Sequence, residues 1–467
     1  MATAVSTVHS HVSAGGAHSL ICSHSKRTMH AFGSGRYGQL GTGLILNQSH
    51  PVVVGSAKLS SDEALAWDDS SHRLVHVAAG NSHSAALTDA GHLYVWGRDH
   101  RGQVGMGDIH ARGEPSTLPR LVTLTQTIAT SFVAHVACGV NFTVAVDGRG
   151  AVYSWGIGVF GNLGHGDTRD RSTPTRIEAF RGHHVVMVAC GAKHTLALAR
   201  YGEVYSFGHG DNGRLGVADS TAAIGGGGGG GAATDIYASS GGLAAAQTGQ
   251  LVPRLVPGIA KGARFIAAGE AHSVAVSRAG LLYTWGAGSY GRLGHGVSQD
   301  FAAPHAVATL TNVRSAACGV FHTMVVTQDG GLWSFGGGSY GQLGLGGGRG
   351  SESGKNARAV LLPQEVQRHV RSFRGYTVRE VACGDFHTIC IADNRDLGAG
   401  SHVLVWGFAV FGRLGLSGEA AAVRRQRVRS GGTSDKEHAG GSGGATGSRG
   451  AKQQTPKRTE ASESLEA

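Results

Sequence analysis

The sequence predicts an all-β protein, a seven-bladed β-propeller built from four-stranded blades. One short phrase recurs seven times along the 467 residues. Short runs rich in Val, Leu, Tyr and Trp surround each copy and are bounded by Gly, which is typical of strands. Gly accounts for 78 residues. That share is far above the usual value of about 7%, and without collagen's three-residue period it indicates many tight turns.

The recurring phrase is a small residue, Gly, two variable residues, then His and Ser or Thr. Its first copy is Ala14-Gly15-x-x-His18-Ser19, and only the copy with Phe142 lacks the His. Successive Gly residues of the phrase are 65, 59, 52, 78, 50 and 65 residues apart. Four strands in a repeat of roughly fifty residues make a propeller blade. We expect a propeller over residues 8–418, with repeats beginning near 8, 74, 132, 184, 262, 312 and 378.

A second phrase follows each first one. It is an aromatic residue and Gly, then Gly-x-Leu-Gly or Gly-x-Val-Gly five residues later, as in Trp285-Gly286 with Gly291-Arg292-Leu293-Gly294. The aromatic residue ends an alternating run, Leu282-Tyr283-Thr284-Trp285, which predicts the third strand of a blade. A late Pro, as in Pro174-Thr-Arg-Ile177, fits a fourth strand at the edge of the sheet.

Together the two phrases resemble the repeat of the regulator of chromosome condensation family, from about residue 8 to 418. The resemblance implies a propeller that binds partner proteins through one face. The founding family member is an exchange factor for the small GTPase Ran, so guanine-nucleotide exchange on a Ran-like or other small GTPase is the alternative function. The fold does not decide between these functions.

The resemblance also implies where a partner would bind, because the founding member uses the loop between the Gly and the His of each repeat. Here that loop contains Asn81, Asn141, Lys193, Glu270 and Asp385. Only Glu270 and Asp385 are acidic, so the face is less acidic than we expect for the binding face of an exchange factor. A further candidate is a polar turn that replaces the Gly-x-aromatic turn of other repeats, although a tolerated surface turn is an equal alternative. Its residues are Arg98, Asp99, His100 and Arg101.

The six repeated histidines are expected to be structural, each hydrogen-bonded within its blade. They are His18, His83, His194, His272, His322 and His387. Zinc needs three or four ligands around one ion, whereas equivalent positions on separate blades are spread around a ring, so we expect no metal site. The small-residue slot is filled by Cys in four repeats, as packing residues. These are Cys138, Cys190, Cys318 and Cys383.

Other motifs argue against catalysis and cofactors. Gly-x-Gly-x-x-Gly occurs five times, from Gly33, Gly156, Gly208, Gly286 and Gly336, at one phase of a β repeat. No helix follows to receive a pyrophosphate, so these predict turns and not dinucleotide sites. The sequence contains neither a phosphate-binding Gly-Lys-Ser/Thr loop nor a Ser-His-Asp order. We therefore expect no catalytic side chain and no cofactor.

Two segments are expected to lie outside the blades. Residues 217–250 contain seven consecutive Gly and predict a flexible insertion. Residues 419–467 have no aromatic residue and predict a disordered tail, in which 423–429 could first pair as a last strand. The tail carries nine Lys and Arg against six Asp and Glu, within a formal charge of +10. It is a solubilising segment or a weak contact to nucleic acid or chromatin.

The remaining expectations concern location and assembly. Six cysteines without paired spacing argue against a secreted protein. A run of 18 apolar residues is absent from the sequence, so no membrane span is expected. We expect a monomer in the cytoplasm, the nucleus or both. An organellar address is a lesser alternative, suggested by the absence of Asp and Glu from residues 1–61.

Overall fold

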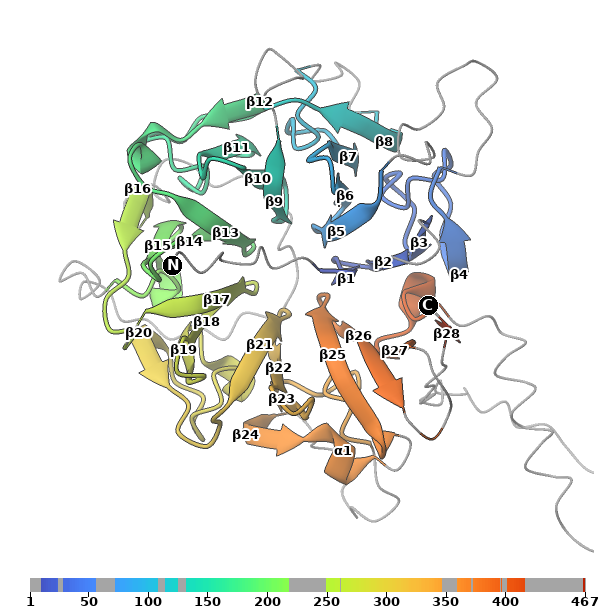
Figure 1. Cartoon of the computed structure of the whole chain (residues 1–467), viewed down its shortest axis with the longest axis vertical. Coiled ribbons are helices and arrows are strands. Elements are labelled where there is room, and N and C mark those ends of the chain that lie inside the picture. The colour runs from blue at the N-terminus through green and yellow to red at the C-terminus, as the bar shows by residue number, and fades with distance from the viewer. Residues whose placement is uncertain are drawn as a thin grey trace, which may run out of the picture.

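The computed structural model of the chain describes residues 10–23, 28–55, 72–107, 114–124, 132–217, 249–260, 262–346, 359–370, 373–394, 396, 401–415 and 465–466. Seven antiparallel sheets stand around a ring, and each sheet contains four strands in chain order (Figure 1). The predicted fold class is confirmed.

The strands of blades 1 to 4 are β1 Val12–Ala14, β2 His18–Ser23, β3 Thr28–Gly33, β4 Gln48–Val53, β5 Leu74–Ala79, β6 His83–Thr88, β7 Leu93–Gly97, β8 Ser116–Val122, β9 Val133–Cys138, β10 Phe142–Asp147, β11 Val152–Gly156, β12 Arg171–Arg176, β13 Val185–Cys190, β14 His194–Ala199, β15 Val204–Gly208 and β16 Gln250–Leu255. Those of blades 5 to 7 are β17 Ala263–Ala268, β18 His272–Ser277, β19 Leu282–Gly286, β20 Phe301–Ala306, β21 Val313–Cys318, β22 His322–Thr327, β23 Leu332–Gly336, β24 Val360–Glu365, β25 Tyr376–Cys383, β26 His387–Asn394, β27 Ser401–Gly407 and β28 Leu465–Glu466. One α-helical turn, α1 Val366–His369, connects β24 to β25.

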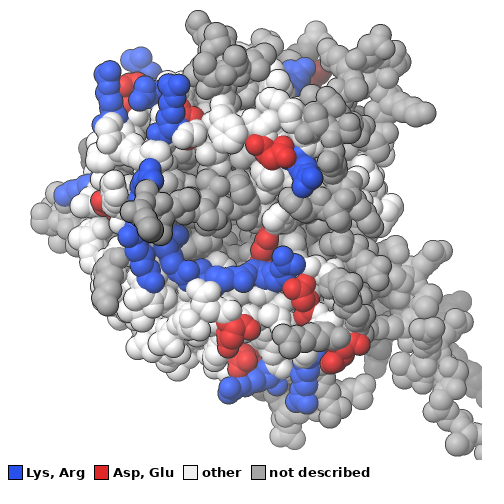
Figure 2. Space-filling model, in the orientation of Figure 1, with Lys and Arg blue, Asp and Glu red and all other residues white. Residues whose placement is uncertain are grey.

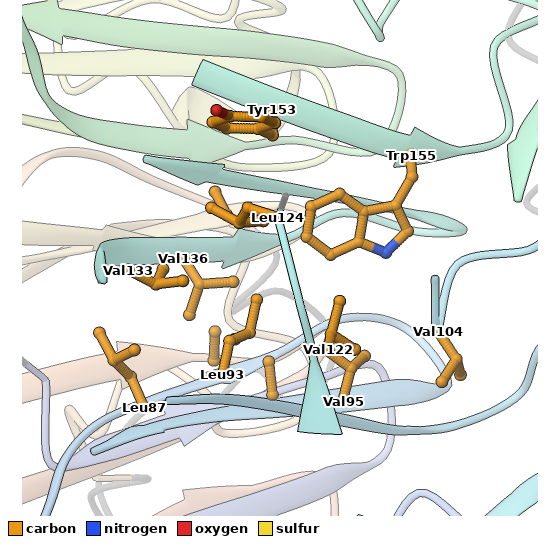
Figure 3. Close-up of a cluster of buried hydrophobic side chains, with 13 residues drawn as sticks. Leu87, Leu93, Val95, Val104, Val122, Leu124, Val133, Val136, Tyr153 and Trp155 are labelled. Carbon is orange, nitrogen blue, oxygen red and sulfur yellow. The ribbon is translucent and has the colours of Figure 1, made fainter. Parts of the chain in front are cut away.

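The hydrophobic core is divided among the contacts between neighbouring blades. Every residue of β6 is buried, because other blades cover both faces of its sheet. Between blades 2 and 3, Val95 and Val122 of one blade pack with Val136 and Trp155 of the other (Figure 3). A cluster of this kind fills each of the seven contacts in the ring. Neighbouring blades therefore stabilise one another through buried apolar area.

The glycines of the five Gly-x-Gly-x-x-Gly motifs form turns, as expected. The first Gly of each motif has a φ between 103° and 110°, a region open to Gly and closed to most other residues. Each of these glycines ends the third strand of its blade, and a fourth strand follows in the same sheet. The turn interpretation is confirmed.

The end of the propeller differs from the expectation in one respect. The fourth strand of blade 7 is β28, in which Leu465 pairs with Val403 and Glu466 pairs with His402. Residues 419–467 were predicted to be disordered, apart from a last strand that 423–429 could form. The 423–429 segment, nearly all of the expected insertion 217–250 and the rest of the tail lie outside the described residues. No helix among the described residues is long and apolar enough to span a membrane.

Candidate functional site

Each repeat histidine forms its hydrogen bond with the next blade and not within its own blade, which corrects our expectation. His18 Nε2 lies 2.8 Å from Ser84 Oγ of blade 2. The same contact, at 2.9 to 3.2 Å, joins His83 to Thr143, His194 to Ser273, His272 to Thr323, His322 to Thr388 and His387 to Ser19. The last pair closes the ring between blades 7 and 1. The histidines are therefore structural, but they connect blades.

A backbone carbonyl completes each connection and fixes the direction of the hydrogen bonds. Ser84 Oγ donates to Gln39 O at 2.8 Å, so His18 Nε2 must donate to Ser84. Trp96 Nε1 donates to the same carbonyl at 2.9 Å. The small-Gly pair is explained here too, because a Cβ on Gly15 would lie 2.3 Å from the Gly80 carbonyl oxygen. The two phrases thus encode the contact between blades and not the blade alone.

Burial keeps these imidazoles neutral. Desolvation lowers the pKa of His18, His83 and His322 to about 3, and lowers the pKa of the other three well below 6.5. At the contact between blades 3 and 4, Phe142 stands in place of the His, and Thr195 keeps its hydrogen bond to Asn162 O. Six of the seven contacts therefore contain a neutral, buried His–hydroxyl pair.

The loops between first and second strands lie at one end of the ring, which we call the His-loop face. They are residues 15–17, 80–82, 139–141, 191–193, 269–271, 319–321 and 384–386. Loops between third and fourth strands lie at the same end, because the strands of a blade alternate in direction. All nine partner-face candidates therefore lie on the His-loop face.

Within the polar turn, the Asp99 side chain is part of the fold. Asp99 is buried, and its Oδ1 accepts a hydrogen bond from Val104 N at 2.8 Å. Gln103 Nε2 lies 3.3 Å from His100 Nδ1. Burial, together with the neighbouring Arg98 and Arg101, lowers the pKa of His100 to about 4. These contacts hold the turn against its own blade, which supports the interpretation as a tolerated polar turn.

The two arginines of this turn contact neighbouring blades. The Arg98 guanidinium lies over the Tyr37 ring of blade 1, 4.5 Å from its centroid. Arg101 NH1 lies 3.4 Å from Asp170 Oδ2 of blade 3. At partial exposure such contacts contribute little to stability, roughly 0–1 kcal/mol each. The turn therefore contacts blades 1 and 3 as well as its own blade.

The two asparagines also engage adjacent blades. Asn81 N donates to Gly139 O at 3.2 Å, and Asn141 Oδ1 accepts from Gln103 Nε2 at 3.4 Å. Asp385 contributes its backbone carbonyl, which accepts from Val320 N at 3.3 Å. The structure thus distributes Asn81, Asn141 and Asp385 over separate contacts around the ring.

Lys193 and Glu270 are the two candidates that the structure brings together. They line a cleft of about 310 Å³ between blades 4 and 5, with Arg214 and Arg292. We call this the cation cleft. Burial raises the pKa of Glu270, and it lowers the pKa of Lys193 and of Arg292, the latter to about 10. Lys193 Nζ also lies 4.6 Å from the Phe160 ring centroid.

The arginines of the cleft hold an unusual backbone turn. Arg292 Nε donates to Ser289 O at 3.0 Å, and Tyr290 between them has a left-handed φ of 62°. The Gly-Gln-Leu-Gly turns differ, because Gln342 Oε1 accepts from Tyr340 N and Tyr340 has no positive φ. Arg214 and Arg413 form the arginine type of turn, with Asn212 and Phe411 left-handed. The residue before Leu or Val therefore selects the turn geometry.

Aromatic rings form a connected surface beside the cleft, over blades 5 to 7. Tyr290 lies 4.9 Å from Phe321, Tyr340 lies 5.1 Å from Phe386, and Tyr340 lies 4.6 Å from Phe408, as centroid distances. Phe321 and Phe386 lie 6.1 Å apart and connect the two ends. The Arg413 guanidinium lies over both Phe408 and Phe411, and we call the five rings together with Phe411 the aromatic shelf. Tyr290, Tyr340 and Phe411 are 45%, 48% and 51% exposed.

Arg214, Arg292 and the aromatic shelf were not among the site residues predicted from the sequence. Two signals were available. Arg replaces Gln before Leu in three copies of Gly-x-Leu-Gly, and Phe occupies the second variable position of Gly-x-x-His in two adjacent repeats. Neither signal shows that these side chains meet in one cleft or on one shelf, because they stand in different repeats.

The opposite face has a different character. Arg264, Arg314 and Arg379 occupy equivalent positions near the start of a first strand in blades 5, 6 and 7, away from the His-loop face. Arg278 NH2 donates to Arg200 O at 3.0 Å at the same end. Figure 2 shows a band of Lys and Arg side chains that crosses one face of the ring. The protein thus has charged surface beyond the His-loop face.

Comparison with protein families decides the classification. A family model described as the RCC1-like domain matches residues 116–447, and two models of the regulator of chromosome condensation (RCC1) repeat match residues 28–87 and 74–103. The chain belongs to the RCC1-like family. The RCC1-like relatives include the ultraviolet-B receptor UVR8 of Arabidopsis thaliana, 32% identical over 371 residues, which are 74% of this chain and 79% of that protein.

Other RCC1-like relatives are larger or more distant. The human E3 ubiquitin-protein ligase HERC2 is 31% identical over 83% of this chain, but the match spans only 7% of HERC2. The solved structure of human WBSCR16 has a TM-score of 0.64 at 23% identity, covering 83% of this chain and 87% of that one. Prp20p of Saccharomyces cerevisiae has a TM-score of 0.64 at 22% identity, covering 83% and 82%. These two structures support the RCC1-like fold.

Proposed function

We propose that the protein is a binding platform, an RCC1-like propeller that holds partner proteins on its His-loop face. The aromatic shelf is the observation that carries this proposal. Its large side chains Tyr290, Tyr340 and Phe411 are each about half exposed and lie on one face over three adjacent blades. Connected exposed aromatic surface with a charged rim is typical of protein–protein interaction sites. Buried His–hydroxyl contacts join blades 5, 6 and 7, which carry this surface, and a surface held in place before binding loses less entropy.

Affinity capture with matched variants tests the proposal. The variant Tyr290→Ser, Tyr340→Ser, Phe411→Ser removes the exposed rings of the shelf. Tyr201→Ser is the control, because Tyr201 is 77% exposed and lies in the β14–β15 turn at the other end of the ring. We expect the shelf variant to lose partners that the wild type and the control both retain. Identical sets of captured proteins for all three would contradict the proposal.

The alternative is guanine-nucleotide exchange on a small GTPase. It is supported by family membership, and Prp20p, a structure of the same fold, is described with binding properties to Gsp1p and histones. The cation cleft weighs against it. An acidic side chain of an exchange factor would have to attract the cations of the GTPase nucleotide site, but Glu270 already lies among Lys193, Arg214 and Arg292. A panel of Ran-like and Rab-like GTPases carrying fluorescent GDP separates the two functions. Accelerated GDP release would establish exchange, and binding without acceleration would leave the platform. Both functions suit the nucleus or the cytoplasm.

A further inference from the structure

The cation cleft and the aromatic shelf share residues and form one continuous surface. The Arg292 guanidinium lines the cleft and also lies 4.7 Å from the centroid of the Phe321 ring. Ser289 lines the cleft, and the next residue, Tyr290, stacks edge-on against Phe321 at the start of the shelf. A single ligand can therefore contact both parts.

The side chains that line the cleft carry more positive than negative charge. Lys193, Arg214 and Arg292 face one carboxylate, that of Glu270. Arg214 and Arg292 are only 7% and 3% exposed, so water compensates their charge poorly. Two further carboxylates, Asp211 and Asp300, stand nearby and offset part of the positive charge of Arg214. Asp300 accepts from Gly288 N and Asn212 Nδ2, and Asp211 lies 3.6 Å from His209.

The guanidiniums are held in place before any ligand arrives. Arg292 NH1 donates to Val320 O at 2.8 Å, in addition to the bond from Nε to Ser289 O. Arg214 Nε donates to Asp211 O at 2.8 Å, and its NH2 donates to Asn212 Oδ1 at 3.2 Å. Fixed donors lose little entropy when they bind an oxyanion. The presence of Glu270 disfavours a dianionic phosphate more strongly than a carboxylate with a single charge.

Two residues of the shelf have a backbone conformation that is unfavourable for non-glycine residues. Tyr290 and Phe411 are non-glycine residues with φ of 62° and 65°, and each is about half exposed. Such a conformation costs on the order of 1 kcal/mol for a bulky side chain. The arginine type of turn imposes this conformation and leaves both rings exposed on the His-loop face.

We propose that the cation cleft and the aromatic shelf together bind one extended peptide segment of a partner protein, with a carboxylate in the cleft and apolar or aromatic side chains on the shelf. This inference rests on the proposed binding function and defines the chemistry of the partner. Opposite charge brings the carboxylate to Lys193 and Arg292, and the shelf buries the apolar side chains that follow.

Direct binding to synthetic peptides tests this chemistry. The probes are immobilised short peptides with one Glu and two Trp or Leu at varied spacing. Three matched sets replace Glu by Gln, Glu by phosphoserine, or the apolar residues by Ser. Single-stranded oligothymidine is included, because exposed rings beside cations also bind nucleic acid bases. We expect the full-length protein to prefer the Glu peptides by about tenfold or more over the Gln set, with affinity falling as salt rises.

Variants then locate the binding on this surface. Lys193→Ala should weaken Glu-peptide binding by about tenfold, and Tyr290→Gly should do the same. The second variant removes the ring and relieves the left-handed strain, so its melting temperature should not fall. Arg278→Ala and Tyr201→Ser, on the other end of the ring, are the controls for charge and ring and should bind as the wild type does.

Three outcomes would overturn the inference. Equal binding of the Glu and Gln sets, stronger binding of phosphoserine peptides or oligothymidine, or full binding by both Lys193→Ala and Tyr290→Gly would each do so. If the shelf variant loses its captured partners while no Glu peptide binds, the peptide chemistry is wrong and the binding platform stands. If the shelf variant loses no partner, the platform itself fails.

Discussion

Replacing His322 by Phe should destabilise the protein at neutral pH and cost almost nothing in mild acid. His322 Nε2 lies 3.2 Å from Thr388 Oγ1, which keeps its own bond to Gln342 O at 2.8 Å. Phe142 shows that this position accepts a phenyl ring. The variant therefore loses one buried hydrogen bond and leaves one lone pair of Thr388 unsatisfied, about 1–2 kcal/mol in total.

The pH dependence follows from the buried imidazole. Burial lowers the pKa of His322 from 6.5 to about 3, so the folded state keeps it neutral while the unfolded state takes up the proton first. The stability that this group contributes is therefore complete above pH 6.5 and is lost as the pH falls toward 3. At about pH 5 this lowers the free energy of unfolding of the wild type by roughly 2 kcal/mol, and the variant, which lacks the imidazole, keeps that stability.

Urea unfolding at about pH 7.5 and about pH 5 measures the difference. We expect the deficit of His322→Phe to shrink from about 1–2 kcal/mol to near zero between the two conditions. His50→Phe is the control, because His50 is exposed on the edge strand β4 and should show no such change. An equal deficit of His322→Phe at both pH values would refute the neutral, buried His–hydroxyl contact.

Three further predictions concern the contacts between blades. Phe142→His should supply the missing partner for Thr195 and raise the free energy of unfolding at neutral pH by up to about 1 kcal/mol, with a steeper loss in acid; no gain at neutral pH would mean that the imidazole does not reach the hydroxyl. The intact protein should lose stability progressively below pH 6.5, by up to about 1.4 kcal/mol per pH unit for each of its six buried histidines, and a flat profile in a pH titration of melting would contradict their burial. Gly294→Ala should cost about 2–5 kcal/mol, since its φ is +78° and a Cβ would lie 2.9 Å from the Phe335 ring. Gly258→Ala, with φ +87° and nothing within 4 Å, should cost only about 1–2 kcal/mol, so equal thermal shifts for the two would argue against the close contact.

The sequence predicts the blades well because their residues repeat at a fixed phase. The Gly-x-x-His phrase marks the turn from first to second strand in every blade, and the aromatic-Gly step marks the end of the third. What the repeat does not reveal is the partner of each His. A bond from His18 to its own blade and a bond to Ser84 fit the same phrase, and only the spatial order of blades selects the second.

The candidate site was harder to predict, because function lies at positions that vary between repeats. Lys193 and Glu270 were identified from their loop, but their common cleft depends on Arg214 and Arg292, which stand in other turns. Spacing along the chain does not show that these four side chains converge. Asp99 shows the converse, because this polar residue of a divergent turn is buried and its carboxylate accepts a hydrogen bond from Val104 N in the same turn.

Among the strands that the structure describes, none is shared between the first and last blades of the ring. Blade 1 is formed by β1 to β4 and blade 7 by β25 to β28, and His387 with Ser19, like His11 with Glu380, joins them by side chains. The contact between blades 7 and 1 thus uses the same His–hydroxyl pair as five of its six counterparts. The chain could therefore start at any blade without changing how the blades pack. A circular permutant opened in another connection between blades would form the same seven contacts.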